Sequence, residues 1–251
     1  MPISIFQKQN QASGSFNNGE ILEKKPIGFP QDGGETKPYS NLFYWAHAWT
    51  PGAKSTIALH PHQGFEICSF VLKGSIKHYD TKKKRWIILN KGDVQIIRAG
   101  NGISHSEEIF DSSEIFQIWF DPDISKTINK SASYSDYKSR EFPVVKGNNI
   151  ETKIICGGKS PFKMDSERIE INNHKLNNGD FRFNLNHHLI YSFFIIDGEL
   201  IYNGKKISKG AFVILKKESY VNFIVADFLE IFEIKSPLKP SYPTYFERFI
   251  N

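Results

Sequence analysis

The stretch HPHQGFE, at residues 60–66, gathers metal-type side chains at the entry to an apolar strand. On an extended chain, residues two apart project from the same face. His60, His62 and, if no bulge intervenes, Glu66 can therefore point into one barrel interior. An isolated pair of histidines is more often a surface or hydrogen-bonded feature than a ligand set, so this stretch needs a partner elsewhere in the chain.

A second cluster, in AGNGISHSE at residues 99–107, supplies that partner. His105 and Glu107 repeat the two-residue spacing, and the glycines before them let the chain turn back sharply. If the two clusters lie on neighbouring strands, they can meet at one ion.

The rest of the sequence predicts an all-β protein. Helical periodicity is nearly absent, and short runs rich in Ile, Val, Phe and Tyr recur between Gly, Asn, Asp and Lys clusters. The spacing of these runs is typical of a sandwich or barrel. The predicted strands cover residues 56–59, 65–72, 75–79, 86–90, 94–97, 115–120, 192–196, 199–202, 212–215 and 228–234.

An internal repeat indicates two domains. FVLKGSI from Phe70 is followed by KGDVQII, and FIIDGEL from Phe194 is followed by KGAFVIL. Duplication of one β unit explains both pairs, and it predicts domains at 1–130 and 131–251. The polar segment 124–140 is the expected linker. The segment 236–250, rich in proline and aromatic residues, is expected to pack over a barrel as an extended strap.

Composition narrows the class of protein. The two cysteines do not form a disulfide framework or a Cys-rich zinc site, which favours a reducing compartment. Neither a signal peptide nor an apolar run of membrane-spanning length is visible, so we expect a soluble, cytoplasmic protein. The net charge is +5, but it is scattered over turns such as 82–85, which argues against nucleic acid as a partner.

The two stretches follow the two-part cupin pattern, and HPHQGFE with AGNGISHSE closely resembles the paired motifs of pirins. The resemblance is strongest over residues 56–121. It implies two tandem cupin (jelly-roll) barrels and one divalent metal ion, usually iron, on the residues that match His60, His62, His105 and Glu107. Imidazoles with one carboxylate suit Fe(II), Mn, Ni, Co or Zn, and the absence of a thiolate argues against a closed structural zinc site.

The carboxylate has two candidates. The general cupin pattern would use Glu66, whereas the pirin resemblance and the spacing from His105 favour Glu107. Glu66 then becomes an acceptor that orients a ligand imidazole. In the second half, His187 and His188 are adjacent and are expected to point to opposite faces, so no metal is expected there.

Two functions follow from the resemblance. The first is a dioxygenase that opens a flavonol such as quercetin with O2, with Glu107 or Glu66 taking the proton of the substrate hydroxyl. The second is an iron-dependent, redox-sensing regulatory protein that binds a protein partner without turnover. An enzyme needs a cavity beside the metal, whereas a switch does not.

Overall fold

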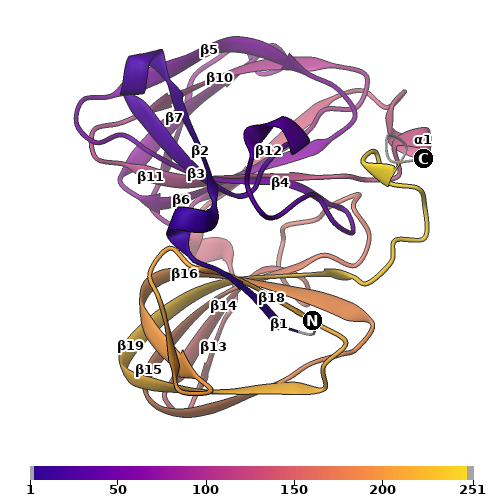
Figure 1. The fold of residues 1–251 in the computed structure, drawn as a ribbon. Helices are drawn as coiled ribbons and strands as arrows, with labels where there is room; N and C mark the ends of the chain where they lie inside the picture. The colour runs from indigo at the N-terminus through magenta and orange to yellow at the C-terminus, as the bar shows by residue number, and fades with distance from the viewer. Residues whose placement is uncertain (1–2, 248–251) are drawn as a thin grey trace. The chain divides into compact units, whose positions relative to one another are not determined.

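The computed structural model describes residues 3–247, and its regular structure is nearly all β (Figure 1). Contacts divide the chain into two compact units. We call Gln11–Ser139, together with the segment from Ser241, the first barrel, and Arg140–Pro240, together with the start of the chain up to Asn10, the second barrel. Among the described residues, no helix is long and apolar enough to cross a membrane.

The first barrel contains two antiparallel sheets. The smaller sheet has the order β5 (Ser55–His62), β10 (Ile103–Ile109), β7 (Ser75–Asp80) and β8 (Ile87–Asn90). The larger sheet has the order β12 (Ser133–Tyr137), β9 (Val94–Arg98), β6 (Glu66–Lys73), β11 (Glu114–Phe120), β4 (Leu42–Trp49), β3 (Ile21–Ile27) and β2 (Ala12–Phe16). A buried cluster joins the two sheets: Ile21, Ala48, Val71 and Ile115 from the larger sheet meet Ile76, Leu89 and Ile109 from the smaller one.

The second barrel is one curled antiparallel sheet. Its order is β1 (Ile3–Phe6), β18 (Phe212–Lys216), β16 (Leu189–Tyr202), β19 (Tyr220–Pro237), β15 (Glu170–Asn184), β14 (Ile150–Cys156) and β13 (Val144–Gly147), with β17 (Lys205–Ser208) beside β16. The strands β15 and β19 are 15 and 18 residues long and pair along most of their length. Their inward side chains, with those of β16 and β18, form the apolar interior.

The predicted repeat is present in the backbone hydrogen bonds. In the first barrel, Lys91 N–H donates to Gly74 O (3.0 Å) and Gly92 N–H donates to Val71 O (2.8 Å). In the second barrel, Lys209 N–H donates to Gly198 O (3.1 Å) and Gly210 N–H donates to Ile195 O (2.8 Å). All four glycines have positive φ values, between 68° and 85°, which residues with a Cβ atom rarely adopt.

The predicted linker is more ordered than expected. Within 124–140 the chain forms the short helix α1 (Ile124–Thr127) and the strand β12, which pairs with the edge of β9. Tyr134 is buried there. The residues around it are polar, so the sequence lacks the alternation of apolar and polar residues that predicts a strand. The short 3-10 helix η4 (Ser139–Glu141) follows. The three others are η1 (Lys8–Asn10), η2 (Asn17–Gly19) and η3 (Pro30–Asp32).

The compact units differ from the predicted domains 1–130 and 131–251 at both ends of the chain. The strand β1 pairs with β18 of the second barrel. Of the predicted strap, residues 236–240 belong to the second barrel, and residues 241–247 lie on the first barrel. There, the Tyr242 hydroxyl donates to Asp121 O (2.8 Å), and the Tyr245 ring lies 5.1 Å from that of Phe65. Residues 248–250 of the predicted strap lie outside the described residues.

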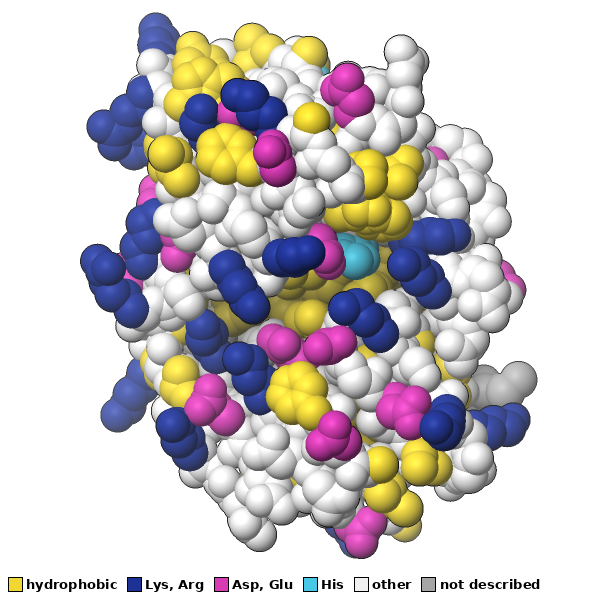
Figure 2. All heavy atoms as spheres, turned by 90° about the vertical axis from the view of Figure 1, so that its left-hand side faces the viewer, with side chains coloured by type: hydrophobic (Ala, Val, Ile, Leu, Met, Phe, Trp, Pro, Cys, Tyr) yellow, Lys and Arg dark blue, Asp and Glu magenta, His cyan; other side chains and the backbone are white. Residues whose placement is uncertain are grey.

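Charged side chains are interspersed on the face drawn in Figure 2, where Lys and Arg alternate with Asp and Glu. Surface ion pairs of the chain include Lys77 with Glu108 (3.1 Å) and Lys206 with Glu199 (2.8 Å). The basic run 82–85 is exposed in the turn between β7 and β8. Surface pairs of this kind contribute little to stability.

The glycine turn of the repeat generates a test of stability. At Gly198 (φ +77°) an added Cβ would overlap the backbone oxygen of Phe228, whereas at Gly204 (φ +74°) it would meet nothing within 4 Å. Gly204→Ala should lower the free energy of unfolding by about 1–2 kcal/mol, the cost of the left-handed backbone. Gly198→Ala should lower it by roughly 1–3 kcal/mol more because of the overlap. Urea unfolding measures both, and equal losses would contradict this packing.

Candidate metal centre

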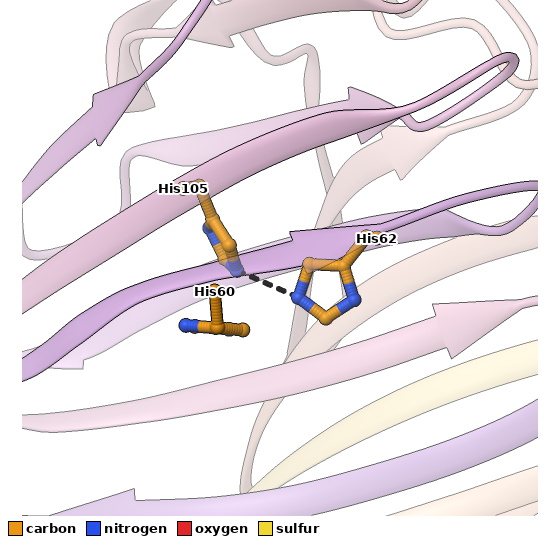
Figure 3. A group of neighbouring side chains, drawn as sticks. All are labelled: His60, His62 and His105. Atoms are coloured by element: carbon orange, nitrogen blue, oxygen red, sulfur yellow. Dashed lines mark hydrogen bonds between the residues drawn. The ribbon is translucent and has the colours of Figure 1, made fainter.

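The pairing of β5 with β10 brings three histidines together. His60 and His62 are two apart on β5, and His105 on β10 lies directly opposite His60. Figure 3 shows the three imidazoles facing one another, with ring centroids 4.5–4.8 Å apart. Their potential ligand atoms all lie within 4.8 Å of one another. This is the meeting of the two sequence clusters that their spacing predicts.

Hydrogen bonds orient these rings for an ion. His60 Nδ1 lies 2.7 Å from the backbone oxygen of Ala58, which can only accept, so Nδ1 carries the hydrogen and Nε2 keeps its lone pair. The Nε2 atoms of His62 and His105 lie 3.0 Å apart (Figure 3). A backbone carbonyl that fixes the tautomer of an imidazole in this way is the usual partner of a metal-binding histidine.

The surroundings keep the imidazoles neutral. Burial, followed by the neighbouring His105 and His60, lowers the pKa of His62 to about 3, although Glu107 opposes the shift. Burial, followed by His60 and His78, holds the pKa of His105 well below its ordinary value. Neutral imidazole is the form that binds a metal, so at neutral pH no proton has to leave these two rings.

Glu107 lies on β10, as His105 does, but side chains of the larger sheet hold its carboxylate. Its buried carboxylate accepts hydrogen bonds from the Ser69 hydroxyl (2.7 Å) and from the side-chain amides of Gln95 (2.8 Å) and Gln117 (2.5 Å). A bulge in the β5–β10 register between His105 and Glu107 sets the carboxylate opposite Ile57, while His78 of β7 lies opposite it on the other side. Among the described residues, its ligand atoms group with those of His78 and His105.

Glu66 does not share the strand of His60 and His62. The chain turns at Gly64 (φ +83°), so Glu66 becomes the first residue of β6, in the larger sheet. There it lies opposite Arg98, and the Arg98 Nε is 3.5 Å from its carboxylate. The condition for one continuous face from His60 to Glu66, a strand without interruption, is therefore not met.

Aromatic side chains adjoin the histidines, and three tryptophans of this barrel have different surroundings. Trp119 packs edge-on against His62, with ring centroids 4.8 Å apart, and Phe65 lies beside it. Trp45, in contrast, is fully buried against Phe116 as ordinary core, and Trp86 is exposed. An open pocket of about 530 Å³ also adjoins His62, between the end of β5 and the start of β10. Its lining includes Pro61, His62, Gln63, Asn101, Gly102 and Ser104.

The histidines of the second barrel differ from expectation. His187 and His188 are exposed in a turn before β16, and their rings lie 3.9 Å apart, so alternation along a strand does not apply to them. A further histidine of this barrel, His174, was not predicted to have a role and is buried on β15. Its two nitrogens lie 3.1 Å from Glu233 and 2.9 Å from the Thr152 hydroxyl. Only the long β15–β19 register brings His174 and Glu233 together.

From the sequence alone, a surface or hydrogen-bonding role is the first interpretation of His78, with no ligand partner. The structure buries it fully, with Nε2 2.9 Å from Asp80. Of these two alternatives, the structure shows the hydrogen-bonding role. The signal that could have identified this pair is its two-residue spacing, the same spacing as in the two motifs.

Comparison with known proteins gives a family match for the part of the chain that contains the two motifs. Residues 29–120 match the family model described as Pirin. The match covers the part of the first barrel that holds both motifs. The resemblance inferred from the two motifs is thus confirmed, and the matched segment contains all four residues proposed as ligands.

One curated relative of the matched segment is the quercetin 2,3-dioxygenase of Escherichia coli, 33% identical over 94 residues, which are 36% of this chain and 38% of the relative. The matches span about a third of the length of the curated relatives. Among solved structures, a quercetin 2,3-dioxygenase from Acinetobacter baumannii superposes with a TM-score of 0.79 and 20% identity, covering 94% of this chain and 79% of that one. The nickel(II) complex of the E. coli pirin YhhW gives 0.77 and 18%, covering 94% and 99%.

These structural matches establish the cupin fold that the sequence predicted. At such low identity they establish the fold alone. The histidine and glutamate clusters of the first barrel could bind a metal, and a metal occurs in the nickel-bound relative.

The lowered pKa values predict how the stability of the metal-free protein depends on pH. The ordinary imidazole pKa is 6.5, and that of His62 falls to about 3 on folding. As the pH falls below 6.5, the unfolded chain binds protons first, so the free energy of unfolding should decrease between these values. The slope is at most ~1.4 kcal/mol per pH unit for each histidine.

Urea unfolding of chelator-treated protein at pH 7, 6 and 5 measures this slope. His62→Asn should flatten it, and His187→Asn, at an exposed position, should not. Identical slopes in wild type and His62→Asn would contradict the burial of His62 as a neutral ring.

Proposed function

We propose that this protein is a metal-dependent dioxygenase that opens the ring of a flavonol such as quercetin with O2. His60, His62, His105 and Glu107 are the proposed ligands, and Fe(II) is the expected ion, with Mn, Ni, Co and Zn as other candidates. The observation that carries the proposal is the group of three histidines, whose potential ligand atoms lie within 4.8 Å of one another. Burial keeps His62 and His105 neutral, and an open pocket adjoins His62.

The donor set fits such an ion. Three imidazoles and a carboxylate suit a first-row divalent metal, and in six-fold coordination they leave two positions free. Both cysteines are buried, and neither belongs to the metal-type groups of the described residues. When bound, the ion supplies Lewis acidity, which favours the enolate form of a hydroxyl next to a carbonyl.

The residues of the chain have separate roles in this proposal. Glu107 takes the proton of the substrate hydroxyl, and Gln95 and Gln117 fix the orientation of its carboxylate. Trp119, edge-on to His62, offers an apolar surface to a flat substrate. The pocket next to His62 has the size of ordinary small-molecule sites. This open space favours the enzyme over the alternative, a redox-sensing regulatory protein.

A first test concerns the metal itself. Protein purified without added metal should contain close to one transition-metal ion per chain, and His62→Ala should lower that content severalfold. His187→Ala, at an exposed turn of the second barrel, should leave the content unchanged. Elemental analysis of the three proteins measures this, and equal loss from both variants would mean that the assignment to the first barrel is wrong.

A second test separates turnover from metal retention. Glu107→Gln keeps the size of the side chain and an oxygen ligand but removes the base, so turnover of quercetin should fall by about two or more powers of ten. Part of the metal should remain. Oxygen uptake with quercetin measures the rate. An unchanged rate, with Glu66→Gln inactive instead, would transfer the role of base to Glu66.

A metal-loaded wild type that consumes no oxygen with any flavonol would remove the support for the dioxygenase. The redox-sensing alternative would then require different partner binding by the Fe(II) and Fe(III) forms.

A further inference from the structure

A second group of metal-type side chains lies deeper in the first barrel. His78 on β7 stands opposite Glu107 on β10, and both lie next to His105. Their potential ligand atoms lie within 4.8 Å of one another, and all three residues are 0% exposed. We call this the inner group, and His60, His62 and His105 the outer group. His105 belongs to both.

The ring of His78 is held in one orientation. It stacks on Tyr134, with centroids 4.4 Å apart and planes 12° from parallel. Its Nε2 lies 2.9 Å from Asp80 Oδ2. The other oxygen of Asp80 accepts from the backbone N–H groups of Lys82 and Lys83, both at 2.7 Å. The carboxylate therefore cannot swing away without losing these two bonds.

This arrangement leaves a lone pair pointing inward. Because Asp80 accepts the hydrogen of Nε2, the neutral ring has its lone pair on Nδ1. That atom is buried and finds no hydrogen-bond partner among residues 3–247. A carboxylate that holds one nitrogen of an imidazole while the other nitrogen binds a metal is a common feature of metal sites.

Glu107 supplies a second, independent indication. Its carboxylate is fully buried, and within the described part of the chain its partners are the neutral side chains of Ser69, Gln95 and Gln117, with no ion pair to Lys or Arg. Burying a charge without a partner of opposite sign is costly. A cation at the inner group would provide that partner.

We propose that His78, His105 and Glu107 form a second, inner position for a divalent first-row metal ion. Two imidazoles and a carboxylate are a suitable donor set for Fe(II), Co(II), Ni(II) or Zn(II). The His105 tautomer that donates from Nε2 to His62 leaves its lone pair on Nδ1, which is also buried and unpaired among the described residues. A neutral imidazole has one lone pair, so His105 serves one ion at a time.

The two positions are therefore alternatives, and the wild type saturates with one ion. An ion at the inner position is surrounded by fully buried side chains. There it has no direct access to a substrate in the pocket beside His62.

Cobalt(II) provides the probe, because its visible spectrum reports the ligand set. The background variant His60→Ala/His62→Ala removes the outer group. Protein purified without added metal loses the ion from this variant, but on dialysis against excess Co(II) it should bind one Co(II) per chain, more weakly than the wild type and with a different spectrum. Equilibrium dialysis of the metal-free full chain measures the ratio, and circular dichroism confirms the fold. If the double variant does not fold, His62→Ala alone serves as the background.

Two further changes in that background test the inner group. His78→Phe keeps a ring against Tyr134 without a ligand nitrogen, and it should abolish the binding of Co(II). Asp80→Asn keeps an oxygen for the backbone of Lys82 and Lys83 but offers an N–H to His78 Nε2. It reverses the tautomer of His78 and should weaken binding at least tenfold. His187→Phe, in the exposed turn of the second barrel, is the control and should change nothing.

A folded background variant that binds no Co(II) would overturn the inner position, and so would full binding after His78→Phe. The inner group would then be a buried hydrogen-bond network only. These outcomes do not depend on turnover of a flavonol, so the inner position and the dioxygenase can fail separately.

Discussion

The antiparallel pairing of β5 with β10 determines which side chains meet inside the first barrel. With His105 opposite His60, the three imidazoles face one another, and a bulge interrupts the register between His105 and Glu107. A slip of one residue would turn His105 outward and bring Ser104 or Ser106 inward, because side chains alternate along a strand. The register is held by the apolar ends of these strands, since Ile109 of β10 is buried between the sheets. The site therefore depends on a packing contact at the far end of the same strand.

The interior of the first barrel is costly to build without an ion. Two imidazoles are held neutral by burial, and a carboxylate is enclosed by neutral donors. Each buried group is hydrogen-bonded where a partner exists, as Glu107 is by Ser69, but the inward nitrogens of His78 and His105 have none among the described residues. The second barrel fills the equivalent interior mainly with apolar side chains. Binding of a metal to the first barrel would return part of the desolvation cost, which couples metal binding to folding.

The sequence was informative where the relevant geometry is local. The period of two along a strand predicted that His60, His62 and His105 can meet, and the two glycine turns revealed the duplication that the matching hydrogen bonds confirm. It failed at Glu66, because a single turn at Gly64 moves this residue to another sheet. The strand β12 was hidden by its polar composition. His174 was missed because its partner Glu233 depends on strand register, which a single sequence does not specify, and the same holds for the position of His78 opposite Glu107.

The central claim is that one first-row metal ion is bound by the three outer histidines of the first barrel. X-ray absorption at the metal edge, on wild-type protein carrying one ion per chain, tests it most directly. The account predicts a first shell of nitrogen and oxygen that includes three imidazoles and no sulfur. A sulfur ligand, or a shell with fewer than three imidazoles, would contradict it.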